Sequence, residues 1–294
     1  MKTLIIINPI SSKIKKYFKN HDKIIELLKT KYDVVDEIKT KYRFHAGEII
    51  RTNKGKYDLI IFAGGDGLIN ESLEAIIETK QIFSFIALGG ANVLSIEIGF
   101  SKNPIKTVKK ILSGTKNKIY LGKVDNTYFI LMFEIGLGGY SVKYFNPKIK
   151  KINYYLAYLF SATKSFLSYR KYSTMDVEVK NDNIVKNINN IKQNIITNVK
   201  HYAGNYTITK NTSLQKQKLI MIYPKKNSLF SFLKGIISIF VLKKSSSKNL
   251  LQVEADEIKI KLKDNSFSQI DGDYFSDKTE YTVKVITQPV EMIY

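Results

Sequence analysis

The amino-acid sequence predicts an α/β domain followed by a mostly β domain. The chain has 294 residues, which at roughly 150 residues per domain indicates two domains. In the first third of the chain, short apolar runs alternate with helical patterns, as expected for a parallel sheet with right-handed crossovers. From about Ile119 onward, strand-like runs separated by turn residues dominate. The boundary is therefore expected near residues 118–122.

Each element of the first domain follows from a local pattern. Continuous apolar runs predict buried strands at residues 3–7, 34–38, 57–63 and 82–88. A helix capped by Ser11 or Ser12 is expected to run to about Thr30. Shorter helices are expected at residues 45–51, at residues 69–79 and after the Gly89-Gly90 pair.

The second domain is predicted mainly from apolar runs bounded by turn residues. These runs predict strands at residues 119–124, 128–135, 174–180, 195–200, 219–223, 257–262 and 281–286. Two helices, at residues 154–169 and 228–242, are expected to interrupt them.

Composition excludes several classes of protein. The chain has no cysteine, which excludes disulfides, thiolate metal sites and cysteine nucleophiles. A hydrophobic fraction of 44 % with 12 % aromatic residues excludes a disordered chain. No apolar run approaches the roughly 18 residues of a transmembrane helix. The apolar stretch at residues 4–7 is too short for a signal peptide, so a cytoplasmic protein is expected.

The net charge of +21 indicates an attraction to anionic surfaces. Nearly all of the basic residues are lysines, and the arginines are Arg43, Arg51 and Arg170. Nucleic-acid surfaces usually depend on arginine, so no specific nucleic-acid partner is expected. Each lysine near an anionic membrane contributes about 1 kcal/mol of attraction, which favours a membrane surface as the partner.

Two glycine turns carry the strongest functional signal. In IIFAGGDGLINES a strand leads into a helix through Gly64, Gly65, Asp66 and Gly67, and glycines in such a turn let the backbone approach a phosphate. Asp66 fits contact with a metal-bound phosphate or a part in proton transfer; the alternative is a tight turn with Asp as a cap. ALGGANVLSIEIG is a second such turn after the next strand, and we expect the two to converge at one sheet edge.

These motifs resemble those of the diacylglycerol kinase catalytic family, which includes bacterial soluble lipid kinases and is related to sphingosine and ceramide kinases. GGDGLINES resembles its GGDGT-x-NE motif, and ALGGANVLSIEIG resembles PLGTANVLAREIG. IINPISSK, Thr40 with His45-Ala46, KINYYLAYL, QIDGD and KVITQPVEMIY resemble its NP-x-SG-K, T…GHA, K…GYLAY, Q-x-DGE and closing-strand segments. The matches run in order along nearly the whole chain.

The resemblance implies a lipid kinase of two domains. Residues 1–120 would form a domain similar to phosphofructokinases and NAD kinases that binds ATP and Mg²⁺, with residues 288–294 returning to it. Residues 121–287 would form a β-sandwich that offers the lipid site. The residues implied at the nucleotide are Asn8, Thr40, Gly64, Gly65, Asp66, Gly67, Leu68, Ile69, Asn70, Glu71, Gly89, Gly90 and Asn92. Asp273 would be the general base, with Asp271 supporting or replacing it and with Asp66 and Glu71 organising the phosphate site.

The sequence departs from the family pattern at four places. Leu68 and Gly90 each stand where the family has Thr, and Asp273 replaces Glu. The shorter Asp273 side chain withdraws its carboxylate by roughly 1 Å, a displacement that can lower a rate by about 100-fold. Residues 214–219, which match the family's regulatory Mg²⁺ segment, contain no carboxylate, so no such metal site is expected there.

The sequence therefore favours an ATP-dependent lipid kinase that acts on diacylglycerol in phospholipid metabolism. Two alternatives stay open: a related kinase such as an NAD kinase, and a weakened or inactive protein that still binds lipid or nucleotide. Residues 224–244 are apolar and flanked by Lys225-Lys226 and Lys243-Lys244, which predicts either an interfacial helix or a helix packed on the β domain. Whether the chain forms a homodimer is left open.

Overall fold

The computed structural model describes residues 1–145, 154–240 and 248–294. The chain divides into two compact units. Unit 1 comprises residues 1–121, 201–205 and 287–294, and unit 2 comprises residues 122–200 and 206–286. The side chains of the 151–159 motif and the Lys243-Lys244 pair lie outside the described residues.

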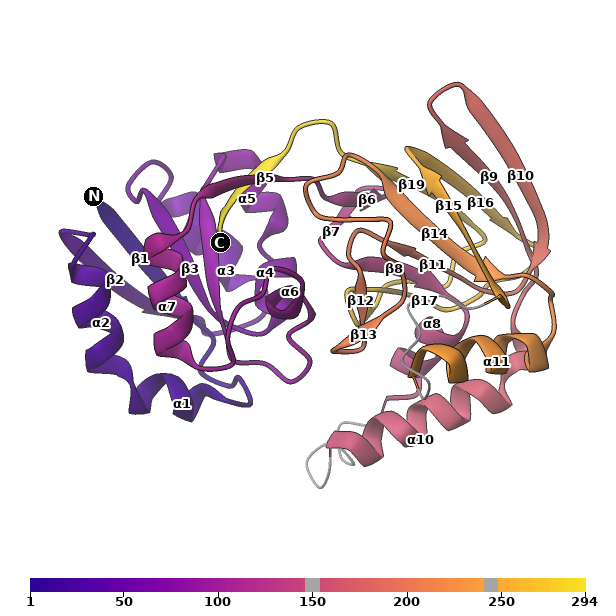
Figure 1. The fold of residues 1–294 in the computed structure, drawn as a ribbon, viewed down its shortest axis with the longest axis horizontal. Coiled ribbons are helices and arrows are strands. Elements are labelled where there is room, and N and C mark those ends of the chain that lie inside the picture. The colour runs from indigo at the N-terminus through magenta and orange to yellow at the C-terminus, as the bar shows by residue number, and fades with distance from the viewer. Residues whose placement is uncertain (146–153, 241–247) are drawn as a thin grey trace. The chain divides into compact units, whose positions relative to one another are not determined.

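Unit 1 contains a six-stranded sheet with the order β2-β1-β3-β4-β20-β5 (Figure 1). Its strands are β1 (Lys2–Ile7), β2 (Val34–Lys39), β3 (Leu59–Gly64), β4 (Phe83–Ala87), β5 (Lys116–Ile119) and β20 (Val290–Ile293). The pairings from β2 to β20 are parallel, and β5 joins β20 in the antiparallel sense. Strands β3 and β4 are buried along their whole length, as expected for a parallel sheet covered on both faces.

Two of the helices that the sequence predicts for unit 1 are each divided into two shorter helices, whereas the helix predicted at residues 45–51 is confirmed. The helices of unit 1 are α1 (Ile14–Lys19), α2 (His21–Lys29), α3 (His45–Thr52), α4 (Asp66–Asn70), α5 (Leu73–Thr79), α6 (Val93–Glu97) and α7 (Pro104–Ser113). The single helix expected up to Thr30 is wrong. Asn20 takes a non-helical conformation between α1 and α2, and its side chain donates a hydrogen bond to the Lys16 carbonyl. Neither predicted serine caps α1, which begins after Lys13 without a side-chain cap.

The helix expected over residues 69–79 is also divided. Helix α4 ends at Asn70, and α5 begins at Leu73. The hydroxyl of Ser72, which lies between the two helices, donates a hydrogen bond of 2.8 Å to the Leu68 carbonyl. Ser competes in this way for backbone groups at a helix end.

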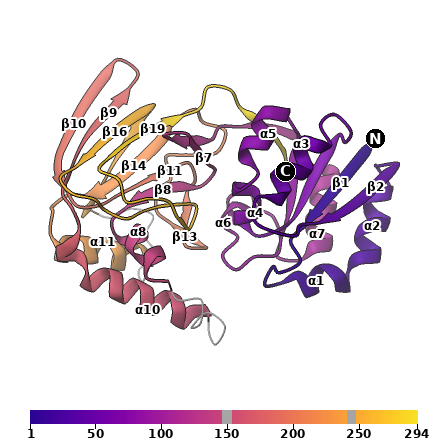
Figure 2. The ribbon, with the colours of Figure 1, turned by 180° about the vertical axis from the view of Figure 1, so that it is seen from behind.

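Unit 2 contains two six-stranded antiparallel sheets, seen from opposite sides in Figures 1 and 2. One has the order β10-β9-β16-β19-β6-β7, with β6 (Gly122–Val124), β7 (Thr127–Phe129), β9 (Met175–Asn181), β10 (Ile184–Ile191), β16 (Glu257–Leu262) and β19 (Glu280–Val285). The other has the order β15-β14-β11-β8-β17-β18, with β8 (Met132–Ile135), β11 (Asn194–Thr197), β14 (Leu219–Pro224), β15 (Leu250–Ala255), β17 (Ser268–Ile270) and β18 (Asp273–Tyr274).

The remaining elements lie around these sheets. They are α8 (Leu137–Lys143), α10 (Tyr154–Leu167), a 3₁₀ turn (Tyr169–Lys171), α11 (Leu229–Phe240) and β13 (Tyr206–Thr207). The short strand β12 (His201–Tyr202) belongs to unit 1. The α/β part followed by a mainly β part agrees with the fold class predicted from the sequence.

Several strands differ from their predicted extents. The run at 119–124 is two strands, β5 in unit 1 and β6 in unit 2. The run at 128–135 is broken between β7 and β8. The sequence does not predict strand β10, because half of its residues are polar and its apolar residues, Ile184, Val185, Ile188 and Ile191, do not alternate with them as the pattern of a half-buried strand requires.

Candidate active site

The two glycine turns of unit 1 touch each other. They follow β3 and β4, which are parallel neighbours, and the Leu88 amide donates to the Gly64 carbonyl. A Cβ placed on Gly89 would lie 2.7 Å from the Cα of Gly65, far inside van der Waals contact. The turns therefore converge at the carboxyl end of the sheet, as the sequence predicts. The approach requires glycine at Gly89 and leaves little room for a side chain at Gly65, whose Cβ would lie 3.2 Å from the Gly89 Cα.

Asn92 shapes the second turn from within. Its backbone is left-handed, with φ 51°, and its side chain is buried. The side-chain oxygen accepts the Gly89 N–H at 2.9 Å, and the side-chain nitrogen donates to the Gly89 carbonyl at 2.9 Å. Both ends of this amide are thus bonded to the turn itself, which supports a structural role for Asn92.

Asp66 links the two turns. It begins α4, and its Oδ2 accepts the Val93 N–H at 2.8 Å. Val93 is the first residue of α6, directly after the second turn. The Asp66 carboxylate therefore connects the segments that follow β3 and β4.

Leu68 and Ile69 belong to the core. Their side chains are 3 % and 0 % exposed, and a Cβ placed on Gly64 would lie 2.6 Å from Leu68 Cδ2. Any contact of these two residues with a nucleotide would therefore involve their backbone and not their side chains. By contrast, a Cβ on Gly67 would meet no atom within 4 Å, and Gly90 is exposed.

Asn8 and Thr40 lie at the same sheet edge. The Asn8 amide donates to the Ala63 carbonyl at 3.0 Å, which places Asn8 beside the end of β3. Thr40 follows β2, and both its amide (2.8 Å) and its hydroxyl (3.4 Å) donate to the Ile7 carbonyl. The structure thus brings both residues to the edge that carries the glycine turns.

Glu71 holds a neighbouring loop. Its Oε2 accepts the Phe44 N–H at 3.1 Å, and Phe44 has a left-handed backbone with φ 68°. Glu71 follows Asn70, the half-buried last residue of α4. Glu71 therefore anchors the start of α3 to the segment that follows the first turn.

Lys13 is a candidate that the predicted set omits. Its amide donates to the Leu88 carbonyl at 2.9 Å, and its ammonium donates to the Gly90 carbonyl at 3.4 Å. Burial, together with the nearby charges of Lys102 and Lys16, lowers the pKa of the Lys13 ammonium. The signal that could have identified it is its place at the end of IINPISSK.

Asp273 lies on a tight hairpin in unit 2. Strands β17 and β18 pair with Ile270 opposite Asp273. The two residues of the turn, Asp271 and Gly272, have φ values of 50° and 92°, which is the type I′ pattern favoured by Asp-Gly. Asp273 is the first residue after this turn and is exposed.

Asp271 is bonded to the backbone of a different loop. Its carboxylate accepts the N–H groups of Ile130, Leu131 and Met132 at 2.9, 2.9 and 2.8 Å. These residues join β7 to β8. Of the two roles that the sequence left open, this geometry fits the supporting one, because the carboxylate ties the hairpin to the β7–β8 turn.

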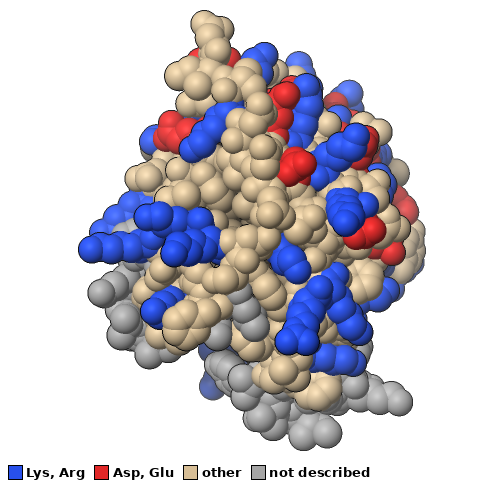
Figure 3. Space-filling model, turned by 90° about the vertical axis from the view of Figure 1, so that its right-hand side faces the viewer, with Lys and Arg blue, Asp and Glu red and all other residues tan. Residues whose placement is uncertain are grey.

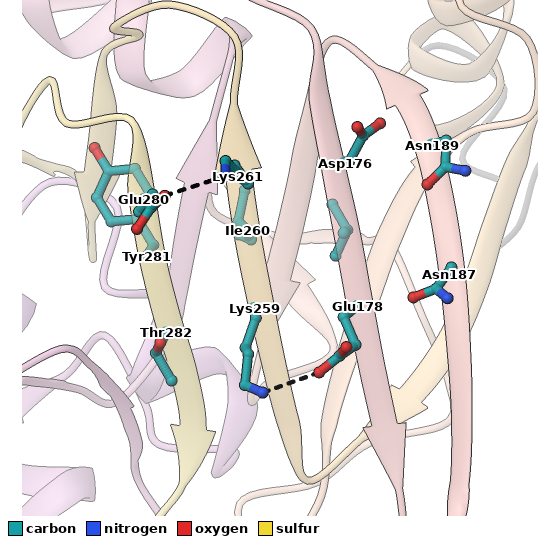
Figure 4. A pocket seen from close by; sticks show the side chains of 11 residues that line it. Asp176, Glu178, Asn187, Asn189, Lys259, Ile260, Lys261, Glu280, Tyr281 and Thr282 are labelled. Carbon is teal, nitrogen blue, oxygen red and sulfur yellow. Dashed lines mark hydrogen bonds and ion pairs between the residues drawn. The ribbon is translucent and has the colours of Figure 1, made fainter.

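A hollow of about 340 Å³ lies elsewhere, on the polar face of the sheet that contains β9, β10, β16 and β19 (Figure 4). Four of the five charged side chains that line it form two ion pairs, Lys259 with Glu178 at 3.0 Å and Lys261 with Glu280 at 3.8 Å. It contains no residue of the predicted site. We assign it no function.

Within residues 1–145, 154–240 and 248–294, no group of three or more His, Asp or Glu side chains is arranged to hold a metal. In the same residues, every helix is too short or too polar to cross a bilayer.

Comparison with known proteins shows what the chain resembles. Residues 2–124 match the diacylglycerol kinase catalytic domain. This match and the similarity to kinases along nearly the whole chain support a lipid kinase. A Bacillus subtilis diacylglycerol kinase is 24 % identical over 92 % of this chain and 89 % of its own length.

Other relatives cover different parts of the chain. A Staphylococcus epidermidis diacylglycerol kinase is 30 % identical over 60 % of this chain and 56 % of its own length. A Streptococcus pneumoniae protein, provisionally named a lipid kinase, is 25 % identical over 99 % of this chain and 97 % of its own length. A crystal structure from Bacillus anthracis, provisionally described as a diacylglycerol kinase, shares the fold with a TM-score of 0.81 at 20 % identity, covering 100 % of this chain and 97 % of that one.

Proposed function

We propose that this lipid kinase transfers the γ-phosphate of ATP to a lipid hydroxyl, with diacylglycerol as the acceptor. The observation that carries the proposal is the backbone contact between Gly65 and Gly89 at the carboxyl end of the parallel sheet, the edge where ligands of open α/β sheets bind. The names of the relatives from B. subtilis and S. epidermidis support diacylglycerol as the substrate.

The first unit fits the phosphates of ATP. Gly67 offers backbone without an obstructing side chain, and the Lys13 ammonium lies against Gly90. Mg²⁺ in kinases is usually held by one or two carboxylates together with the phosphates, and Asp66 is the carboxylate of the turn that would hold it. Bound there, Mg²⁺ would offset the charge of the transferred phosphoryl group. Gly65, Gly67 and Gly90 would let the backbone approach the phosphates.

Asp273 is the proposed general base. A lipid hydroxyl is a poor nucleophile, and a carboxylate within hydrogen-bond reach can accept its proton as the bond to phosphorus forms. Asp273 is exposed at the end of a rigid two-residue turn, while Asp271 anchors that turn. In this proposal the Asp273 carboxylate accepts the proton, and the Asp271 carboxylate holds the turn that positions Asp273.

We also propose the finer fold expected from the sequence. Unit 1 would share its fold with phosphofructokinases and NAD kinases, and the two sheets of unit 2 would form a β-sandwich. Strands β9 and β16 alternate buried and exposed residues, as strands with one face in the core of a sandwich do.

The kinase is further proposed to bind an anionic membrane surface through α11. Phe230 and Ile237 on this helix are 67 % and 46 % exposed, whereas Phe232 and Ile239 are buried. One side of the helix is thus packed, and the other presents apolar side chains together with Lys234, whose ammonium lies 4.5 Å from the Phe230 ring centre. This arrangement combines the two alternatives that the sequence left open.

The surrounding charge favours the same surface. The chain has no Asp or Glu between Ile135 and Met175 or between Asn183 and Val253, the stretches that include α10 and α11. In Figure 3 the lower part of unit 2 correspondingly shows Lys and Arg and no Asp or Glu. Apolar side chains beside basic ones are the pattern of an interfacial helix.

Phosphoryl transfer can be tested with vesicles. The protein would be incubated with radiolabelled ATP, Mg²⁺ and anionic vesicles containing diacylglycerol, and label in the lipid phase would be measured. Asp273→Asn should lower kcat by at least about 100-fold, and Asp277→Asn, a change at an exposed carboxylate four residues further on, should not. Absence of transfer by folded, vesicle-bound wild type would instead indicate a non-catalytic binding protein.

Membrane binding is tested separately by sedimentation with vesicles. The double substitution Phe230→Ser with Ile237→Ser should weaken binding to anionic vesicles at least about tenfold, because it removes two apolar side chains from the contact. Ile184→Ser, at a 70 % exposed position on β10, is the matched control. Equal binding by both variants would rule out α11 as the contact.

A further inference from the structure

Glu134 is a buried carboxylate that the proposed chemistry does not use. It lies on β8 and is 2 % exposed. Its Oε1 accepts the Gly138 N–H at 2.8 Å, and its Oε2 accepts a hydrogen bond of 3.0 Å from the Gln269 side chain. Glu134 and Gln269 are also direct partners in the antiparallel pairing of β8 with β17.

The chain makes room for this carboxylate. A Cβ placed on Gly138 would lie 2.0 Å from Glu134 Oε2, so any larger residue at 138 would displace it. Gly138 is in the first turn of α8, where backbone N–H groups have no partner within the helix. The side chain of Glu134 therefore occupies a place that the glycine keeps open.

The Gln269 side chain connects Glu134 to the β17–β18 hairpin. Its side-chain oxygen accepts the Gly272 N–H at 2.7 Å, and Gly272 precedes Asp273. An ionised carboxylate only accepts hydrogen bonds, and a backbone N–H only donates. The Gln269 amide consequently has one permitted orientation, with nitrogen toward Glu134 and oxygen toward the turn.

We propose that Glu134 is a positioning residue for phosphoryl transfer: by fixing the orientation of Gln269, it fixes the Asp271–Gly272 turn and thereby the place of Asp273. The inference rests on the proposed role of Asp273 as the base. The Asp271 carboxylate anchors the same turn to the start of β8. Two carboxylates therefore hold the hairpin, one on β8 and one in the turn itself.

The order of donors and acceptors along this chain of bonds gives a sharp test. In Glu134→Gln, the oxygen of the new side-chain amide accepts the Gly138 N–H, so its NH₂ group faces Gln269. The NH₂ group of Gln269 must then face either this NH₂ group or the Gly272 N–H, so two donors face each other in both orientations. In the exchanged pair, Glu134→Gln with Gln269→Glu, the amide accepts from Gly138 and donates to the new carboxylate, which accepts from Gly272. All three hydrogen bonds are then possible again.

Kinetics and hydrogen exchange are measured on the full chain. Glu134→Gln should lower kcat by about 100-fold, the effect of a displacement near 1 Å, with KM for ATP changed by less than about twofold because the nucleotide residues are untouched. The Gly272 amide, followed by NMR, should exchange faster. The exchanged pair should restore both kcat and protection, and Glu280→Gln, at an exposed site on β19, should alter neither.

The outcomes separate this inference from the proposed function. Wild-type kcat in Glu134→Gln, or an exchanged pair no better than the single variant, would overturn the role of Glu134. If the wild type itself transfers no phosphate, the proposed function fails. Hydrogen exchange of the Gly272 amide then tests the role of Glu134 by itself. Protection that is lost in Glu134→Gln and regained in the exchanged pair supports this chain of hydrogen bonds, and any other pattern refutes it.

Discussion

Asp271 should be a residue on which both stability and activity depend, while Asp273 should affect activity alone. The Asp271 carboxylate accepts three backbone N–H groups, two through Oδ1 and one through Oδ2. Asp271→Asn keeps an oxygen for two of them and turns an NH₂ group toward the Ile130 N–H. One charge-assisted bond is lost and one donor is left facing another, which costs about 2 kcal/mol.

Asp271→Ala should be more damaging. All three N–H groups lose their acceptor, and alanine at φ 50° adds the left-handed penalty of about 1–2 kcal/mol. We expect a total near 4 kcal/mol, reduced from the simple sum because water reaches part of this turn. Asn tolerates the left-handed region as Asp does, so Asp271→Asn measures the loss of the carboxylate without the backbone penalty.

Urea and thermal unfolding measure the difference. For a unit of this size, about 2 kcal/mol corresponds to a fall in Tm of about 4–8 °C. Asp273→Asn, at an exposed position, should shift the unfolding free energy by less than about 0.5 kcal/mol and yet abolish most of kcat. If Asp271→Asn is as stable as the wild type, the three hydrogen bonds do not anchor the hairpin and the division of roles between the two carboxylates is wrong.

Three further predictions concern unit 1. Gly89→Ala should destabilise the unit by about 1–3 kcal/mol, because its Cβ would overlap Gly65, whereas Gly67→Ala should leave unfolding in urea unchanged; equal effects would contradict the contact. Lys13→Met should raise KM for ATP about tenfold through loss of about 1.5 kcal/mol of charge-assisted bonding, and an unchanged KM would place the ammonium away from the phosphates. Hydrogen bonds to Glu37 and Asp22 raise the pKa of His21 above its ordinary 6.5. Protonated His21 therefore stabilises the folded state, and this contribution is complete below pH 6.5 and lost as the pH rises through the raised pKa. His21→Gln should therefore lower Tm at pH 5.5 and not at pH 9, and a deficit independent of pH would exclude titration as its cause.

The sequence predicted the parts of the fold that depend on local patterns. The apolar runs of β1, β3 and β4 are strands because a strand buried on both faces needs uninterrupted apolar residues. The contact between the two glycine turns follows from the pairing of β3 with β4, since parallel neighbours end at the same edge. Both inferences need only a few consecutive residues and the rules of sheet topology.

The parts that the sequence did not predict depend on distant partners. The Asp271 carboxylate accepts N–H groups about 140 residues earlier in the chain, and no local sequence pattern predicts that contact. Glu134 was not singled out because an isolated Glu in an apolar strand has no motif; its partner Gln269 becomes visible only once β8 and β17 are paired. Leu68 was assigned to the nucleotide by its place in a motif, although its direction on α4 puts it in the core.

The position of β20 determines the order in which the protein can fold as it is synthesised. This strand lies between β4 and β5 in the sheet of unit 1, and the Ser84 hydroxyl binds the Ile293 carbonyl, 209 residues later. All of unit 2 lies between these two positions in the sequence. A ribosome must therefore finish unit 2 before the six-stranded sheet of unit 1 can close, so the chain completes its first unit last.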